Sequence, residues 1–156
     1  MSPDKSSRRA RPADRKRQLV EQAAVLFADR GYTQVSLADI ARAAGVTAPS
    51  VYRHFDDKQS LLAAAVLAGV DDLETCTGRA MADPDAGVDD LIAAVCVLGV
   101  RRTQSTSLWR WASQHLTDEQ NREVVLRTRA ILQRWGAALA EIGVDPLTLS
   151  ASSGNA

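Results

Sequence analysis

The stretch from Val35 to Phe55, "VSLADIARAAGVTAPSVYRHF", constrains the fold more than any other part of this 156-residue chain. Two short helical patterns lie on either side of a single glycine, Gly45. Ser36 stands three residues before Asp39, a capping-box pattern that predicts a helix start, and Gly45 stands where that helix would end. A helix of about nine residues, a turn with glycine and a second short helix form the helix-turn-helix pattern.

The rest of the chain is also patterned for helices. The spacing of apolar residues predicts a first helix over about 13–30, a helix capped by Thr47 after Gly45, and a fourth helix from Asp56 or Asp57 to about residue 82. Further helices are expected over about 88–103, 105–116 and 118–142. No segment alternates apolar and polar residues for more than four or five positions, as a half-buried strand would. We therefore predict an all-α protein.

Charge is distributed unevenly along a chain whose formal net charge is zero. Residues 1–58 contain 11 Lys and Arg against 7 Asp and Glu, a charge of +4, whereas residues 59–156 contain 8 against 12, a charge of −4. This asymmetry predicts nucleic acid contact by the first part only. The two longest apolar runs have ten residues each, about half of a membrane span, and the charged N-terminus lacks a signal-peptide core. We therefore expect a cytoplasmic protein with no membrane segment.

The second helix of the pattern has an inward and an outward face. At about 100° per residue, Val51 and Phe55 lie on one side and are predicted to point inward. The outward side carries hydroxyl, aromatic and guanidinium groups, which suit the phosphates and base edges of the DNA major groove; its members are Pro49, Ser50, Tyr52 and Arg53, with His54 at the boundary. Other interpretations stay open residue by residue: Tyr52 as a half-buried packing residue, His54 as a structural surface histidine, and Arg53 as a solvated charge.

The motifs "AAVLFADRGY" and "SLADIARAAGVTAPSVYRHFDDKQSLL" resemble the DNA-binding domain of the TetR family of transcriptional repressors over residues 15–65. The resemblance implies a three-helix DNA-binding head with a helix-turn-helix, followed by a helical and apparently shortened regulatory domain. The predicted organisation of the chain has three parts. They are a disordered basic arm over 1–13, the DNA-binding domain over 14–74 with the helix-turn-helix at about 36–55, and a ligand-binding and dimerisation domain over 75–156.

The family implies DNA contacts for nine residues: Ser36, Thr47, Ala48, Pro49, Ser50, Tyr52, Arg53, His54 and Lys58. Thr47 to Ser50 match the tip of the recognition helix, which enters the groove. Tyr52, His54 and Lys58 match positions that bind backbone phosphates, and Ser36 matches one that anchors a phosphate. Arg53 sits at a position that varies in the family and is a candidate for base contact.

The sequence departs from the family at one position of the DNA-contacting surface, and basic residues near the N-terminus extend that surface. Ala38 stands where some members carry a base-contacting arginine, so direct readout is expected to be sparse, with hydrophobic contact between the Thr-Ala-Pro tip and thymine methyl groups. Basic residues from Arg8 to Arg17 are candidates for minor-groove or backbone contacts. For Arg8 to Arg11 a solubilising tail is the alternative.

The family also implies a small-molecule effector whose binding moves the fourth helix and releases the repressor from its operator. Met81, Cys96, Trp109 and Trp111 are candidates for the effector pocket, and plain core residues are the alternative for each. Trp109 and Trp111 fall on different helix faces, so at most one should reach a cavity. His115 is predicted to be a capping or surface residue.

We therefore predict a repressor that binds a palindromic double-stranded DNA operator as a homodimer and leaves it when a small-molecule effector binds. The chain is shorter than most family members. Either it is a C-terminally truncated product, or its dimer is built from the remaining helices, such as the apolar stripe from Val124 to Ile142. The alternative is a helical small-molecule-binding or interaction protein whose DNA binding is weak or lost. No cofactor, metal site or enzymatic activity is predicted, and Cys76 and Cys96 are expected to be reduced and buried.

Overall fold

The computed structural model describes residues 11–83, 85, 87–101, 108 and 111–141, and these residues contain helices and no strand. The prediction of an all-α fold is confirmed. The helices are α1 (Pro12–Arg30), α2 (Leu37–Ala43), α3 (Ala48–Tyr52), α4 (Lys58–Met81), α5 (Val88–Arg101), the 3-10 helix η1 (Ala112–His115) and α7 (Asp118–Glu141). Residues 105–107 and 109–110 of the helix predicted over 105–116, and residues 1–10 of the predicted arm over 1–13, lie outside the described residues.

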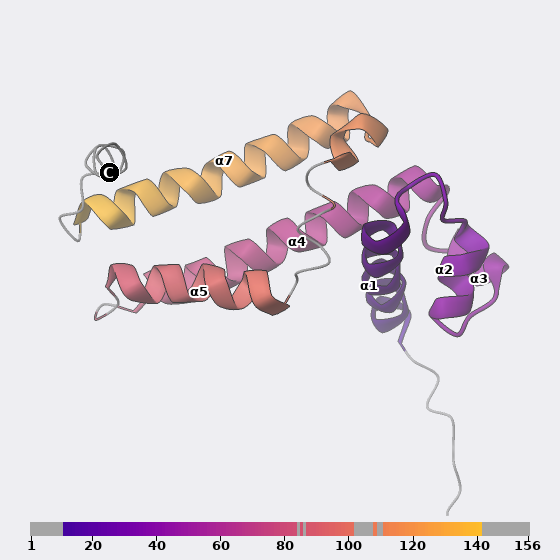
Figure 1. Ribbon diagram of the computed structural model, residues 1–156, viewed down its shortest axis with the longest axis horizontal. Coiled ribbons are helices and arrows are strands. Elements are labelled where there is room, and N and C mark those ends of the chain that lie inside the picture. Colours follow the sequence, from indigo (N-terminus) through magenta and orange to yellow (C-terminus); the bar gives the residue numbers. More distant parts are fainter. Residues whose placement is uncertain (1–10, 84, 86, 102–107, 109–110, 142–156) are drawn as a thin grey trace, which may run out of the picture.

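The long helix α4 is the element on which the others are arranged (Figure 1). Helices α1, α5 and α7 and the short η1 all pack against it. The first three helices gather at the N-terminal end of α4, whereas α5 and α7 run alongside its length. None of the described helices is long and apolar enough to cross a membrane.

The helix ends in the head follow from local chemistry. The Ser36 side chain accepts a hydrogen bond from the backbone N–H of Asp39, and the Asp39 carboxylate accepts one from the backbone N–H of Ser36, which completes the predicted capping box. Gly31 and Gly45 have φ angles of 78° and 64°, the left-handed region that glycine enters without a Cβ clash. Both glycines stand where the sequence predicts a helix to end.

A single hydrophobic core joins the head to η1. The largest fully buried side chains of the head come from each of its helices and from the start of α4: Leu19, Phe27, Val35, Ile40, Val51, Leu61 and Leu62. Leu108 and Ala112 belong to the same buried cluster, and Trp111 and Leu116 pack against it. The segment around η1 is therefore docked directly on the three-helix head.

The apolar stripe that the sequence predicts on α7 is divided between a buried face and an exposed face of the helix. Ile131 is buried and Val124 packs against the core, whereas the side chains of Val125 and Leu132 are 62% and 60% exposed. The reason is that α7 packs on α4 with one side only.

The two cysteines are free, as predicted, but neither of them is fully buried as expected. Cys76 is half-buried on α4, whereas Cys96 is exposed on α5. The face of α5 that carries Cys96 has no described neighbour to cover it, as the exposure of Ile92 and Val97 on the same helix also indicates.

Candidate nucleic-acid interface

The short helix α3 presents its polar side chains to solvent because two apolar residues hold its other side in the core. Val51 and Phe55 are 0% and 5% exposed, as the helical spacing predicts. Tyr52 is 58% exposed and Arg53 is also exposed, while His54 is half-buried at the boundary. An exposure of 58% excludes the alternative in which Tyr52 is a half-buried packing residue.

The outward side chains of α3 are not engaged elsewhere in the part of the chain that the structure describes. The side chains of Tyr52, Arg53 and His54 form no hydrogen bond or ion pair with any of the described residues. Thr47 occupies the N-cap of α3, as predicted, but its hydroxyl makes no capping hydrogen bond. The α3 surface therefore offers a phenol, a guanidinium, an imidazole and a threonine hydroxyl to a partner in solution.

Ser36 differs from these residues because its hydroxyl is already used within the protein. Its Oγ accepts from the Asp39 backbone N–H at 3.1 Å and lies 2.5 Å from Asp39 Oδ2, to which it donates. The hydrogen bonds from the Ser36 side chain and backbone lower the pKa of Asp39 below its ordinary value. A phosphate would have to compete with this carboxylate for the Ser36 hydroxyl proton.

Lys58 also has partners of its own. Its Nζ donates to the carbonyl oxygens of Tyr32 at 2.8 Å and Val35 at 3.0 Å, and it lies 4.2 Å from the centre of the Tyr32 ring. An ammonium group has three N–H bonds, so one remains for a phosphate. The phosphate contact of Lys58 stays a prediction, and the structure adds a second role for the same side chain.

The basic residues at the start of α1 lie in different environments. Lys16 Nζ is 5.5 Å from the centre of the Phe55 ring, which places its charge beside the end of α3. Arg17 pairs instead with Asp14 and Glu21 along α1, at 3.6 Å and 3.8 Å. Arg8 and Arg9 lie outside the described residues. Lys16 therefore places a positive charge near the residues that follow α3.

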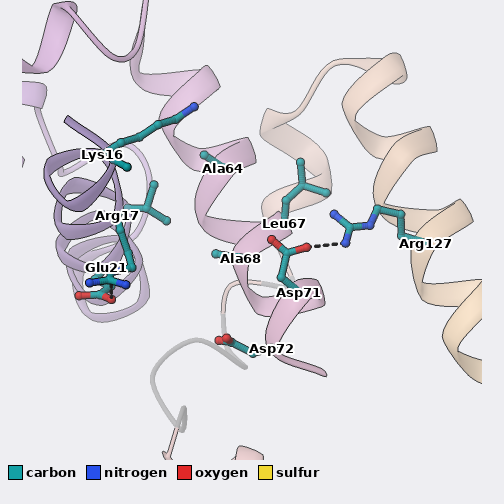
Figure 2. Close-up of a pocket in the computed structure, with 11 residues that line it drawn as sticks. Lys16, Arg17, Glu21, Ala64, Leu67, Ala68, Asp71, Asp72 and Arg127 are labelled. Atoms are coloured by element: carbon teal, nitrogen blue, oxygen red, sulfur yellow. Dashed lines mark hydrogen bonds and ion pairs between the residues drawn. The ribbon is translucent and has the colours of Figure 1, made fainter. Parts of the chain in front are cut away.

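A pocket of about 600 Å³ opens between α1, α4 and α7 (Figure 2). Its apolar wall comes from small and aliphatic side chains such as Val20, Ala64 and Leu67. Charged side chains of both signs surround this wall: Lys16, Arg17, Glu21, Asp71, Asp72 and Arg127. Arg127 reaches across from α7 and forms ion pairs with Asp71 and Glu74, which raise the pKa of its guanidinium.

Among the predicted effector-pocket residues that the structure describes, Met81, Cys96 and Trp111 do not line this pocket. Met81 is half-buried at the last turn of α4, and Cys96 is exposed on α5. Trp111 packs against the core and meets the ring of His115 edge-on at 5.7 Å. Trp109 lies outside the described residues.

Several residues that shape the interface have no signal of their own in the sequence. Gln18 Nε2 donates to the carbonyl oxygen of Ala44 at 3.2 Å and so ties α1 to the end of α2. His115, predicted to be a capping or surface residue, stacks on the ring of Tyr32 at 4.3 Å with an angle of 22° between the planes. Pairs separated by 26 residues or more follow from no local spacing, so only the tertiary structure reveals them.

Sequence comparison places the chain among bacterial regulators. The model of "Bacterial regulatory proteins, tetR family" matches residues 19–65. The HTH-type transcriptional repressor KstR2 of Rhodococcus jostii is 37% identical over 73 residues, which are 47% of this chain and 36% of that protein. The HTH-type transcriptional activator FasR of Mycolicibacterium smegmatis is 36% identical over 85 residues, 54% of this chain and 39% of that protein. The chain therefore spans less than half of the length of these two relatives.

The fold and the exposed α3 surface define a helix-turn-helix protein. A solved structure of a transcriptional regulator of the TetR/AcrR family from Thermobifida fusca is similar over most of both chains, with 30% identity, a TM-score of 0.61, and coverage of 89% of this chain and 79% of that one. This protein belongs to the TetR family of bacterial regulatory proteins.

Proposed function

We propose that this protein is a transcriptional regulator that binds double-stranded operator DNA through α3 and is released from it by a small molecule. The observation that supports this most directly is the set of unengaged polar side chains on α3, held outward by the buried Val51 and Phe55. A repressor is the form we propose, as the sequence predicts. This function places the protein in the cytoplasm with the DNA and requires no enzymatic activity.

The proposed docking places α3 in the major groove. Tyr52 and His54, which follow the tip in the chain, bind backbone phosphates, and the small tip from Thr47 to Ser50 approaches the bases. Most of the affinity then comes from phosphate neutralisation, so binding weakens as salt is added.

Two matched arginines test this docking. Arg53 lies at the end of α3, and Arg79 carries the same charge on the last turn of α4, far along the helix from the head. Duplexes are first selected from a random-sequence pool by the wild-type protein, and their affinity is then measured at several salt concentrations. We expect Arg53→Ala to weaken binding and reduce the salt slope by about 1, while Arg79→Ala leaves both unchanged. Equal effects of the two substitutions would contradict the docking.

Tyr52→Phe tests a single atom of the same surface. The substitution removes only the phenolic hydroxyl, and the side chain is 58% exposed, so folding should be unaffected. Loss of one hydrogen bond to a charged phosphate is expected to weaken binding by roughly tenfold. Affinity equal to that of the wild type would remove Tyr52 from the interface.

For the effector, we infer the pocket between α1, α4 and α7. Its volume of about 600 Å³ lies in the range of small-molecule sites, and an apolar wall within a ring of charges suits a ligand with an apolar body and a polar end. Its walls are α1 of the head and α4, and Arg127 of α7 lies at its edge, so an occupant would contact the head and α4 together. Such a ligand changes DNA affinity if it binds better to one arrangement of these helices.

A substitution that fills the pocket distinguishes this site from one formed by the effector-pocket residues that the sequence predicts. Leu67→Trp fills the pocket with a larger side chain, while Met81→Ala alters a residue of the alternative set. A library of small amphipathic compounds is screened for ligands that raise the melting temperature of the wild type. We expect the shift to disappear in Leu67→Trp and to persist in Met81→Ala; the reverse result would place the effector elsewhere.

A further inference from the structure

The turn between α1 and α2 is held by residues from three other parts of the protein. Tyr32, in this turn, has its ring 5.6 Å from that of Phe27 in α1 and 4.3 Å from that of His115 in η1. Lys58, the first residue of α4, lies 4.2 Å from the same ring and binds the carbonyl oxygens of Tyr32 and Val35. We call Tyr32, Lys58 and His115 the junction.

The junction fixes the start of the helix-turn-helix. Val35 is the residue before Ser36, the N-cap of α2, so the bond from Lys58 to the Val35 carbonyl sets how the chain enters that helix. Burial, and then the nearby charge of Asp57, raise the pKa of Tyr32, so the ring is a neutral phenol at physiological pH. A neutral ring can stack on an imidazole without carrying an additional charge.

The junction also fixes η1. Gln59 Nε2, in the first turn of α4, donates to the carbonyl oxygen of His115 at 2.7 Å, so η1 is attached both to the head through Tyr32 and to α4. The Trp111 ring also meets the His115 ring edge-on, at 5.7 Å between the ring centres. Only two residues separate η1 from α7. A movement of α7 along α4 must therefore either carry the α1–α2 turn with it or break the stack of His115 on Tyr32.

We propose that His115 is a positioning residue, which through its stack on Tyr32 holds the α1–α2 turn, and with it α2 and α3, in the arrangement that binds DNA. This inference rests on the proposed function, because it assigns the contact through which η1 and α7 control the DNA-binding surface. Disengagement of the stack is the step that lowers DNA affinity. His115 itself touches no DNA.

Three variants separate positioning from simple packing. His115→Ala removes the ring, His115→Phe keeps a ring that can stack, and Gln114→Ala changes an exposed neighbour in the same turn. Affinity is measured on duplexes selected from random DNA by the wild type, at a temperature where melting curves show each variant to be folded. We expect His115→Ala to weaken binding roughly two- to tenfold, the factor that an aromatic pair provides, and the other two to stay within about twofold.

The outcomes each decide the proposal. If His115→Ala binds DNA with wild-type affinity but melts at a lower temperature, the stack only packs the core. If His115→Phe and His115→Ala lose DNA affinity equally, the stack is excluded as the cause of the loss. If the wild type selects no duplex, the proposed function fails, and hydrogen exchange decides the positioning role. Exchange at the amides of residues 35–39 should then be several-fold faster in His115→Ala than in Gln114→Ala, and equal rates would overturn it.

Discussion

Asp39 shows how one carboxylate sets the start of α2 and makes it sensitive to pH. Its pKa lies below the ordinary value because the Ser36 side chain and backbone both donate to it. A lowered folded-state pKa means that the capping box contributes stability above the unfolded-state pKa of about 4 and loses it as the pH falls through the lower folded-state value.

We therefore expect Asp39→Ala to lower the free energy of unfolding at pH 7, and the difference from the wild type to shrink as the pH falls below about 4. Urea unfolding at a series of pH values measures this. Asp29→Ala, at an exposed carboxylate of α1 with no described hydrogen bond, is the control for removing a carboxylate that caps no helix. A difference that stays constant with pH would contradict the assignment.

Lys58 allows its two roles to be measured separately. Lys58→Met keeps an aliphatic chain but leaves the carbonyls of Tyr32 and Val35 without their donor, which should lower the free energy of unfolding by about 1–3 kcal/mol. Lys16→Met, which loses only an exposed contact with Phe55, should cost less than about 1 kcal/mol. Unchanged stability of Lys58→Met together with weaker DNA binding would instead make the phosphate contact its main role.

At the scale of elements, two glycines show how the same substitution acts in a turn and in a helix. Gly45 in the helix-turn-helix has a φ of 64°, whereas Gly136 lies within α7, and an added Cβ meets no atom within 4 Å at either position. Gly45→Ala should therefore destabilise by roughly 1–2 kcal/mol through backbone strain alone. Gly136→Ala should stabilise by roughly 0.5–1 kcal/mol, because alanine loses less backbone entropy in a helix. Urea unfolding measures both, and equal signs would contradict the argument.

At the scale of the whole molecule, the exposed apolar side chains of α7 bear on the predicted homodimer. Val125, Leu126 and Leu132 are 62%, 58% and 60% exposed, while Ile131 and Val124 face inward. If α7 supplies the dimer face, Leu132→Asp should shift the protein towards the monomer in sedimentation velocity, because it places a charge in an apolar contact. Gln133→Asp, at the exposed neighbouring position, is the control. Identical sedimentation of Leu132→Asp and the wild type would exclude this face.

The same stripe shows where sequence patterns stop being sufficient. Helical spacing predicts that α7 is amphipathic, but the inward position of Ile131 and the outward position of Leu132 depend on which side of α7 meets α4. The charged edge of the described pocket also depends on tertiary packing. Asp71 and Arg127 are 56 residues apart, and only the packing of α7 on α4 brings them together.

The sequence by itself determined the all-α class, the helix ends at Gly31 and Gly45, the Ser36–Asp39 capping box and the two faces of α3, because each depends on residues within a few positions of one another. Only the tertiary structure decided that Lys58 binds carbonyls in the α1–α2 turn, that His115 stacks on Tyr32, and that a pocket opens between α1 and α4. These contacts join segments far apart in the chain, and their geometry is fixed by how the helices pack rather than by any local preference.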